Sequence, residues 1–166
     1  MGAMKPEHLW WALLALILIQ TVAGGGDGQA RGPGLERARP TAPVHATAAD
    51  RHLLAWLVYW EARGEPFEGQ VAVAAVVLNR VRHPDFPDSI RGVVFQPGQF
   101  QPLDTHRYSA SAQIPPNIYQ AVDLALGGSD PSMGALFFYN PRLTRNPSFW
   151  AGRPVVRKIG NHVFTR

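Results

Sequence analysis

The fold is decided at Trp60-Glu61-Ala62-Arg63-Gly64-Glu65-Pro66, where an acid interrupts an apolar helix face shortly before the helix ends. Upstream, apolar residues recur at helical spacing, and these are Leu53, Leu54, Leu57 and Val58. Asp50 is the expected N-cap of this helix, and Gly64 with Pro66 predicts a helix boundary near Arg63. Glu61 follows Leu57 by four residues, so its carboxyl should project toward the packed side of the helix.

This position predicts a raised pKa for Glu61. Burial disfavours the charged carboxylate, and the partial negative charge at a helix C-terminus disfavours it further. A general acid must hold a proton at working pH, so we expect Glu61 to be catalytic. The alternative is a buried carboxylate paired with Arg63, Arg80 or Arg82, and the pattern alone leaves both interpretations open.

Glu65 is a possible second acid. It lies four residues after Glu61 and would face it if the helix continued, as a two-carboxylate glycosidase requires. Gly64 and Pro66 argue against that continuation. Glu65 and Glu68 then have an alternative role, which is to complement the positive N-terminus of the next helix.

The remaining pattern predicts an α+β fold in which a small antiparallel sheet packs on a helical body. A second helix should begin at Pro66 and carry an apolar stripe to Val81, although its many β-branched residues leave a strand open. We expect a third helix over 116–126. Short strands are expected over 135–139, 155–159 and 162–164, with a hairpin turn at Gly160-Asn161. Residues 89–94 fit either a short helix or an extended segment.

Composition suits one globular domain with an N-terminal appendage, because 46% of the 166 residues are hydrophobic and 17% are charged. An apolar run over 9–19 and the small residues Thr21-Val22-Ala23 predict a signal peptide over 1–23. An uncleaved membrane anchor is the alternative. Residues 24–49 are rich in Gly, Pro, Ala and Arg and should form a linker, which leaves 50–166 as the folded catalytic domain. Either way, we expect the domain to act outside the cytoplasm, in the periplasm or cell envelope.

Several kinds of chemistry lack a motif in this sequence. There is no cysteine, no H-E-x-x-H zinc motif, no G-x-S-x-G elbow, no P-loop and no Rossmann fingerprint. We therefore expect no metal and no cofactor. The formal charge of +4 is spread through the domain, and we find no basic and aromatic pattern typical of nucleic-acid binding.

The segment 96–102 is a turn-rich loop with polar amides and one aromatic ring, a composition that suits a sugar-binding cleft. Gln99 and Phe100 in this loop are candidate substrate-binding residues. Tyr139 and Asn140, at the end of an expected strand, are two more. Three other aromatic residues are expected in the core, namely Trp56, Tyr59 and Trp60.

A family resemblance rests on a long run of residues. Residues 59–81 read YWEARGEPFEGQVAVAAVVLNRV, which closely resembles the signature of the SleB/CwlJ-type cell wall hydrolases, including the spore-cortex-lytic enzymes. Further landmarks follow in the family's order, and these are Phe86-Pro87, Gly92-Val93-Val94-Phe95, Gly98-Gln99-Phe100, residues 135–141 and residues 159–164. The resemblance covers most of 51–164.

This resemblance implies a peptidoglycan-cleaving domain with a lysozyme-like or lytic-transglycosylase-like helical body. The family's essential glutamate maps to Glu61. Such enzymes can cut after N-acetylmuramic acid without water, with one carboxyl acting as acid and then as base. The expected partner is the peptidoglycan glycan strand, bound by a monomer that has a membrane tether only if the signal stays uncleaved. A hydrolytic muramidase, an amidase and a non-catalytic peptidoglycan-binding or scaffold domain are the alternatives.

Overall fold

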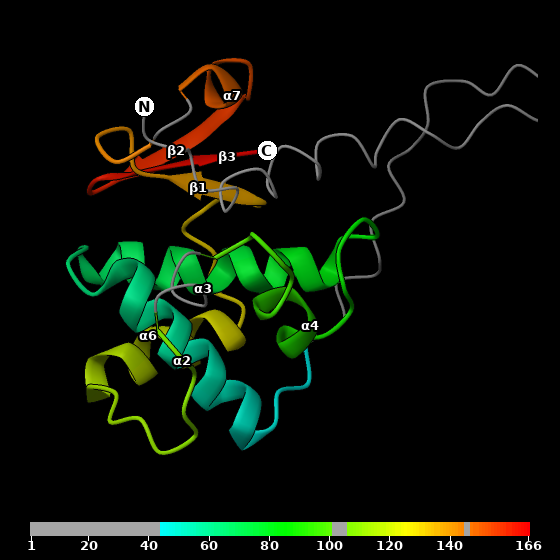
Figure 1. The fold of residues 1–166 in the computed structure, drawn as a ribbon, viewed down its shortest axis with the longest axis vertical. Helices are drawn as coiled ribbons and strands as arrows, with labels where there is room; N and C mark the ends of the chain where they lie inside the picture. Colours follow the sequence, from blue (N-terminus) through cyan, green and yellow to red (C-terminus); the bar gives the residue numbers. More distant parts are fainter. Residues whose placement is uncertain (1–43, 101–105, 145–146) are drawn as a thin grey trace, which may run out of the picture. The chain divides into compact units, whose positions relative to one another are not determined.

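The computed structural model describes residues 44–100, 106–144 and 147–166 (Figure 1). The expected signal peptide over 1–23 and the first part of the expected linker, residues 24–43, lie outside the described residues. The helices are α2 (Ala48–Ala62), α3 (Phe67–Arg82), α4 (Ile90–Val94), α6 (Pro116–Leu126) and α7 (Pro147–Ala151). The strands are β1 (Phe137–Tyr139), β2 (Val155–Ile159) and β3 (His162–Thr165). The predicted α+β fold is confirmed.

Helix α2 begins earlier than the sequence pattern indicated. Thr47 is its N-cap, and Asp50 is the third helical residue of a reciprocal capping box. The Thr47 Oγ1 accepts a hydrogen bond from the Asp50 N–H at 3.1 Å, while the Asp50 carboxylate accepts one from the Thr47 N–H at 3.0 Å. The expectation that Asp50 is the N-cap was therefore wrong. The predicted end near Arg63 is confirmed, because Arg63 is the C-cap.

Helix α3 forms the centre of the domain. It is helical throughout, so the strand alternative is excluded, and residues 69–78 are all buried. Pro66 precedes the helix with an extended ψ of 153° and serves as its N-cap, so the helix begins at Phe67, one residue later than expected. Figure 1 shows the sheet on one side of α3 and the helices α2, α4 and α6 on the other.

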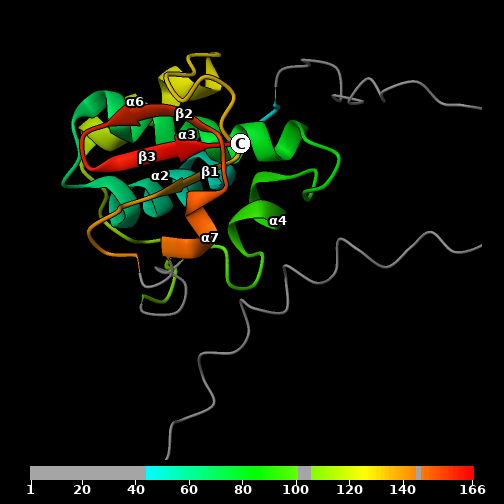
Figure 2. The same ribbon diagram turned by 90° about the horizontal axis from the view of Figure 1, so that it is seen from above.

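The sheet is antiparallel with the strand order β1-β3-β2 (Figure 2). Phe137 pairs with Thr165 and Tyr139 with Val163, so the last strand in sequence lies at the centre, where all its residues are buried. Gly160 has a φ of +56° in the predicted hairpin turn between β2 and β3. A Cβ atom there would collide with the Glu65 carboxylate, so the turn requires glycine.

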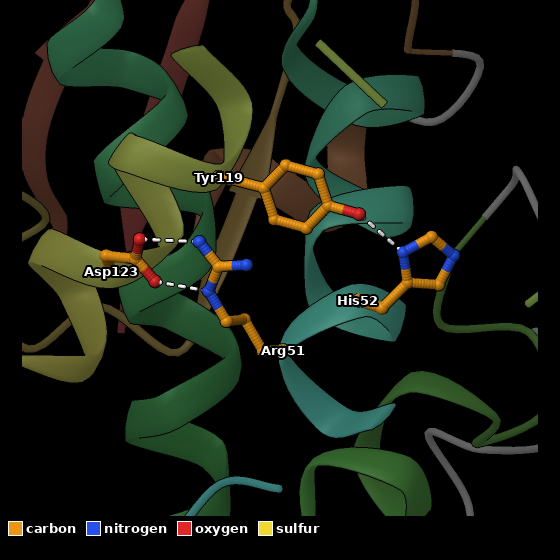
Figure 3. Close-up of polar contacts among 4 residues, drawn as sticks. All are labelled: Arg51, His52, Tyr119 and Asp123. Atoms are coloured by element: carbon orange, nitrogen blue, oxygen red, sulfur yellow. Dashed lines mark hydrogen bonds and ion pairs between the residues drawn. The ribbon is translucent and has the colours of Figure 1, made fainter. Parts of the chain in front are cut away.

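Side-chain contacts join α2 to α6 on the exposed side of the helical body (Figure 3). The Arg51 guanidinium donates two hydrogen bonds to the Asp123 carboxylate, at 2.5 and 2.6 Å. The next residue, His52, lies with Nδ1 2.5 Å from the Tyr119 hydroxyl. Both pairs hold the start of α2 against the middle of α6.

Two short helices complete the domain. In the segment 89–94, which the sequence left open, Ile90–Val94 form α4, and the Ser89 hydroxyl caps it by accepting a hydrogen bond from the Gly92 N–H. Helix α7 was not predicted, and Figure 2 shows it beside β1 at the edge of the sheet. Within the described ranges, no helix is long and apolar enough to cross a membrane.

Candidate active site

Glu61 lies in the last turn of α2 and is half-buried. Burial raises the pKa of its carboxyl to about 7, and the positive charge of Arg80 limits that rise. Among the residues that the structure describes, Glu61 makes no hydrogen bond and no ion pair. The raised pKa predicted from the sequence is confirmed, and no described residue pairs with the carboxyl.

Arg80 is the cation that acts on Glu61, and it is 3% exposed on α3. Its Nε donates a hydrogen bond to the Leu136 carbonyl at 2.7 Å. Its guanidinium carbon lies 5.1–5.3 Å from the centres of three aromatic rings, those of Phe86, Phe100 and Phe137. Burial lowers the pKa of Arg80 to about 10, while Glu61 opposes this shift.

The alternative was that Glu61 is a carboxylate held in an ion pair. Among the described residues, Glu61 forms no such pair. Arg80 influences Glu61 through its charge without a direct salt bridge. Arg63 instead lies over the Trp60 ring, 4.7 Å from its centre, and also contacts Tyr59.

Glu65 has a different environment from Glu61. It lies beyond the end of α2, and its carboxylate accepts hydrogen bonds from the Asn161 backbone N–H at 2.8 Å and side-chain Nδ2 at 3.1 Å. These bonds fasten the turn between α2 and α3 to the β2–β3 hairpin. Glu68 forms a partly exposed ion pair with Arg157 at 2.7 Å. The geometry thus gives Glu65 a structural role, and its role as second acid stays a prediction.

The expected substrate-binding residues lie in two places. Phe100 is 3% exposed and packs against Arg80, and its role in substrate binding stays a prediction. The sequence showed an aromatic ring in a polar loop, but only tertiary packing reveals its burial. The neighbouring Gln99 is half-buried.

Tyr139 and Asn140 lie where β1 ends. The Tyr139 ring stacks on Trp150 of α7 at 4.4 Å with an interplanar angle of 11°. Asn140 stabilises the following turn, because its Oδ1 accepts a hydrogen bond from the Arg142 N–H and its carbonyl accepts one from the Leu143 N–H. One face of Tyr139 and the acceptor atoms of Asn140 are therefore engaged within the protein.

Two pockets are lined by neighbours of Glu61 and Arg80. One, of about 340 Å³, is lined by Trp60, the residue before Glu61, and by His106, whose ring stacks on Trp60 at 3.5 Å. The other, of about 560 Å³, is lined by Phe100, which contacts Arg80. Glu61 lines neither pocket, whereas Arg107 lines both.

Sequence reasoning missed Arg153, which follows α7. Its guanidinium carbon lies 3.9 Å from the centre of the Phe137 ring and 4.7 Å from that of Phe149. Its charge helps to lower the pKa of Arg80, so the two cations are neighbours. No short motif marks Arg153, because Arg153 and Arg80 are 73 positions apart in the sequence and only the fold makes them neighbours.

No group of three or more His, Cys, Asp or Glu side chains in the described ranges is arranged to hold a metal ion. Around Glu61 the described residues bring together a carboxyl with a raised pKa, the buried cation Arg80 and the aromatic rings that surround Arg80. A carboxyl with a pKa near 7 can both donate and accept a proton near neutral pH. This arrangement is suited to general acid–base chemistry.

Comparison with known proteins gives the family. The family model described as Cell Wall Hydrolase matches residues 64–165, which is more than half of the chain. The chain therefore belongs to the cell wall hydrolase family, whose match begins three residues after Glu61. The resemblance inferred from the sequence signature is confirmed.

Individual relatives agree with this assignment. The spore cortex-lytic enzyme of Bacillus subtilis is 48% identical over 119 residues, which are 69% of this chain and 37% of that protein. The catalytic domain of the germination-specific lytic transglycosylase SleB from Bacillus anthracis has a TM-score of 0.68 at 38% identity, covering 75% of this chain and all of that domain. The catalytic domain of Bacillus cereus SleB also has a TM-score of 0.68 at 38% identity, covering 81% of this chain and all of that domain. The chain spans little more than a third of the length of the Bacillus subtilis relative.

Proposed function

We propose that this chain is an exported peptidoglycan-cleaving enzyme, a lytic transglycosylase that cuts after N-acetylmuramic acid with Glu61 as its single catalytic carboxyl. The observation that carries the proposal is the half-buried Glu61 carboxyl, which has a pKa of about 7 and no protein partner in the described part of the chain. The similarity to the catalytic domain of a lytic transglycosylase supports the choice of reaction.

The proposed reaction uses one carboxyl twice. Protonated Glu61 donates its proton to the glycosidic oxygen as the bond from that oxygen to C1 of N-acetylmuramic acid breaks. The resulting carboxylate then takes the proton from the 6-hydroxyl of the same sugar while O6 bonds to C1. One product strand ends in a free hydroxyl, and the other ends in a 1,6-anhydro sugar. No water is consumed, and Glu61 is again protonated.

A carboxyl that performs both steps needs a pKa near the working pH, because it must first donate a proton and then accept one. Burial raises the pKa of Glu61 and favours the protonated form, while the positive charge of Arg80 lowers this pKa and favours the carboxylate. A carboxyl with the ordinary pKa of Glu would be almost fully ionised at neutral pH and would lack the proton for the first step.

Export rests on the sequence of residues 1–23, which has the charge and hydropathy pattern of a signal peptide. An extracytoplasmic location is consistent with a polymer substrate in the cell envelope. Fractionation of cells that express the full chain, followed by mass determination of the mature protein, tests both the location and the cleavage after Ala23.

The proposed activity is tested by incubating purified peptidoglycan with the wild-type chain and with Glu61→Gln. The wild type should release soluble muropeptides, and Glu61→Gln should be slower by at least about 100-fold, because loss of a general acid typically costs that much. Glu68→Gln is the matched control, since Glu68 is an acid of the same type in a partly exposed ion pair. Unchanged release by Glu61→Gln, or glycan binding without release by the wild type, would contradict the proposal.

A further inference from the structure

We propose that Arg80 is a positioning residue for Glu61, and that its buried guanidinium holds one N–H group ready for the Glu61 carboxylate that forms after proton donation. The inference rests on the proposed function, because it assigns a role to Arg80 only in a site where Glu61 changes its charge. It adds a second residue to a reaction that otherwise depends on one carboxyl.

The geometry around Arg80 leaves one nitrogen without a partner. Arg80 Nε is fixed to the Leu136 carbonyl at 2.7 Å, and three aromatic rings surround the guanidinium. Nη1 is buried and has no hydrogen-bond partner among the described residues. Buried donors are rarely left unpaired in native proteins, because the loss of water is not compensated. An unpaired N–H on a fixed cation therefore indicates an acceptor that arrives at another stage of the reaction cycle.

The charges around Arg80 identify that acceptor. Glu61 of α2 raises the pKa of Arg80, whereas Arg153 lowers it, so one neighbour favours the cation and the other opposes it. Glu61 is the acid whose charge acts on Arg80, and it can lose its proton near neutral pH. When Glu61 ionises, the attraction to Arg80 appears at the moment when negative charge develops on the carboxyl.

This arrangement explains how burial and reactivity coexist at Glu61. Burial alone would hold the proton on the carboxyl, which would favour the first step and hinder the recovery of the 6-hydroxyl proton. A preorganised cation stabilises the carboxylate, and the guanidinium itself needs no rearrangement as the charge develops. The aromatic rings keep the guanidinium in place while water is excluded from its faces.

The direct test is an NMR titration of the full chain labelled with [13C]glutamate and [15N]arginine. The Glu61 carboxyl carbon and the Arg80 Nη signals should titrate together with a midpoint near pH 7. In Glu61→Gln the Arg80 titration should disappear, while the signals of Arg157, which pairs with the different acid Glu68, should be unaltered. Arg80 signals that stay constant while Glu61 titrates would overturn the inference, and this readout requires no Arg80 variant to fold.

A kinetic test uses Arg80→Gln and Arg80→Lys, with Arg157→Gln as the control. The alkaline limb of the kcat/KM profile reports the ionisation of Glu61, and Arg80→Gln should move it to higher pH by about one pH unit or more. It should lower kcat at least tenfold, with little change in KM, and Arg80→Lys should restore the limb toward its original pH. A folded Arg80→Gln enzyme with an unchanged profile would contradict the inference. Activity that survives in Glu61→Gln would instead contradict the proposed function, so the two failures are distinguishable.

Discussion

The ionisation of Glu61 links the chemistry of this protein to its stability. The pKa of Glu61 is about 7 in the folded state, against 4.5 for the ordinary group. The folded state therefore keeps a proton that the unfolded state loses, and its stabilising effect is present below pH 4.5 and lost as the pH rises to about 7. At about 1.4 kcal/mol for each pH unit, the loss is on the order of 3 kcal/mol.

Glu61→Gln cannot ionise and should not show this loss. We expect the free energy of unfolding of the wild type to fall by up to about 3 kcal/mol relative to Glu61→Gln between about pH 4 and pH 8. Denaturant unfolding of both proteins across this range measures the difference. Parallel stability curves for the two proteins would show that folding does not perturb Glu61.

A single-carboxyl mechanism makes a separate prediction for Glu65. Glu65→Gln should keep turnover within about tenfold of the wild type, because the substitution preserves an acceptor for Asn161 and removes no reacting group. Rates of muropeptide release by Glu61→Gln, Glu65→Gln and the wild type decide the point. A loss in Glu65→Gln as large as that in Glu61→Gln would favour a two-carboxylate mechanism.

At the scale of the element, the β2–β3 hairpin depends on Gly160. The φ of +56° disfavours a side chain, and an added Cβ would also meet the Glu65 carboxylate and the Pro66 ring. Gly160→Ala should destabilise the protein by about 2 kcal/mol or more. Gly64→Ala is the matched control, since a Cβ at Gly64 has no atom within 4 Å, and it should change stability by less than about 0.5 kcal/mol. Equal unfolding midpoints for the two variants would refute this account of the turn.

The Arg51–Asp123 pair between α2 and α6 should contribute little to stability, despite its short hydrogen bonds (Figure 3). The two side chains are 39% and 50% exposed, so solvent screens their attraction. Arg51→Gln should cost less than about 1 kcal/mol at neutral pH. The hydrogen bonds from Arg51 lower the pKa of Asp123 below its usual 3.8, so this contribution is present above that pH and is lost as the pH falls. Unfolding at neutral and strongly acidic pH checks this, and a larger cost in acid would contradict it.

The elements differ in how well the sequence predicted them. The helix over 116–126 was predicted with its observed bounds, because its apolar stripe lies between a proline and two glycines. The cap of α2 was misassigned because Thr47 and Asp50 both suit a cap, and only their reciprocal hydrogen bonds distinguish them. The five-residue helix α7 has too few residues to show a period.

The site shows the same division between local and tertiary information. The apolar face of α2 was sufficient to predict the raised pKa of Glu61, because the periodicity that marks a buried face is a local property of the sequence. The burial of Phe100 and the approach of Arg153 to Arg80 depend on how the loop after α4 and the segment after α7 fold back on α3. Neither arrangement leaves a periodic signal in the sequence.

In the molecule as a whole, α3 connects the helical body to the sheet. The described domain has the fold of the SleB catalytic domains, and its helical body and its sheet are joined through α3 and β1 (Figure 1). Arg80 also joins these two parts, because it extends from α3 to the carbonyl that precedes β1. The same contact that stabilises the domain thus places a cation next to the acid.

The most direct test of the central claim is mass spectrometry of the fragments released from purified peptidoglycan in water enriched in 18O, with Glu61→Gln run in parallel. The account predicts muropeptides that end in a 1,6-anhydro sugar, are one water lighter than hydrolysis products and carry no 18O, and it predicts their absence with Glu61→Gln. Fragments of full hydrolytic mass that carry 18O would contradict the account and identify a muramidase that activates water.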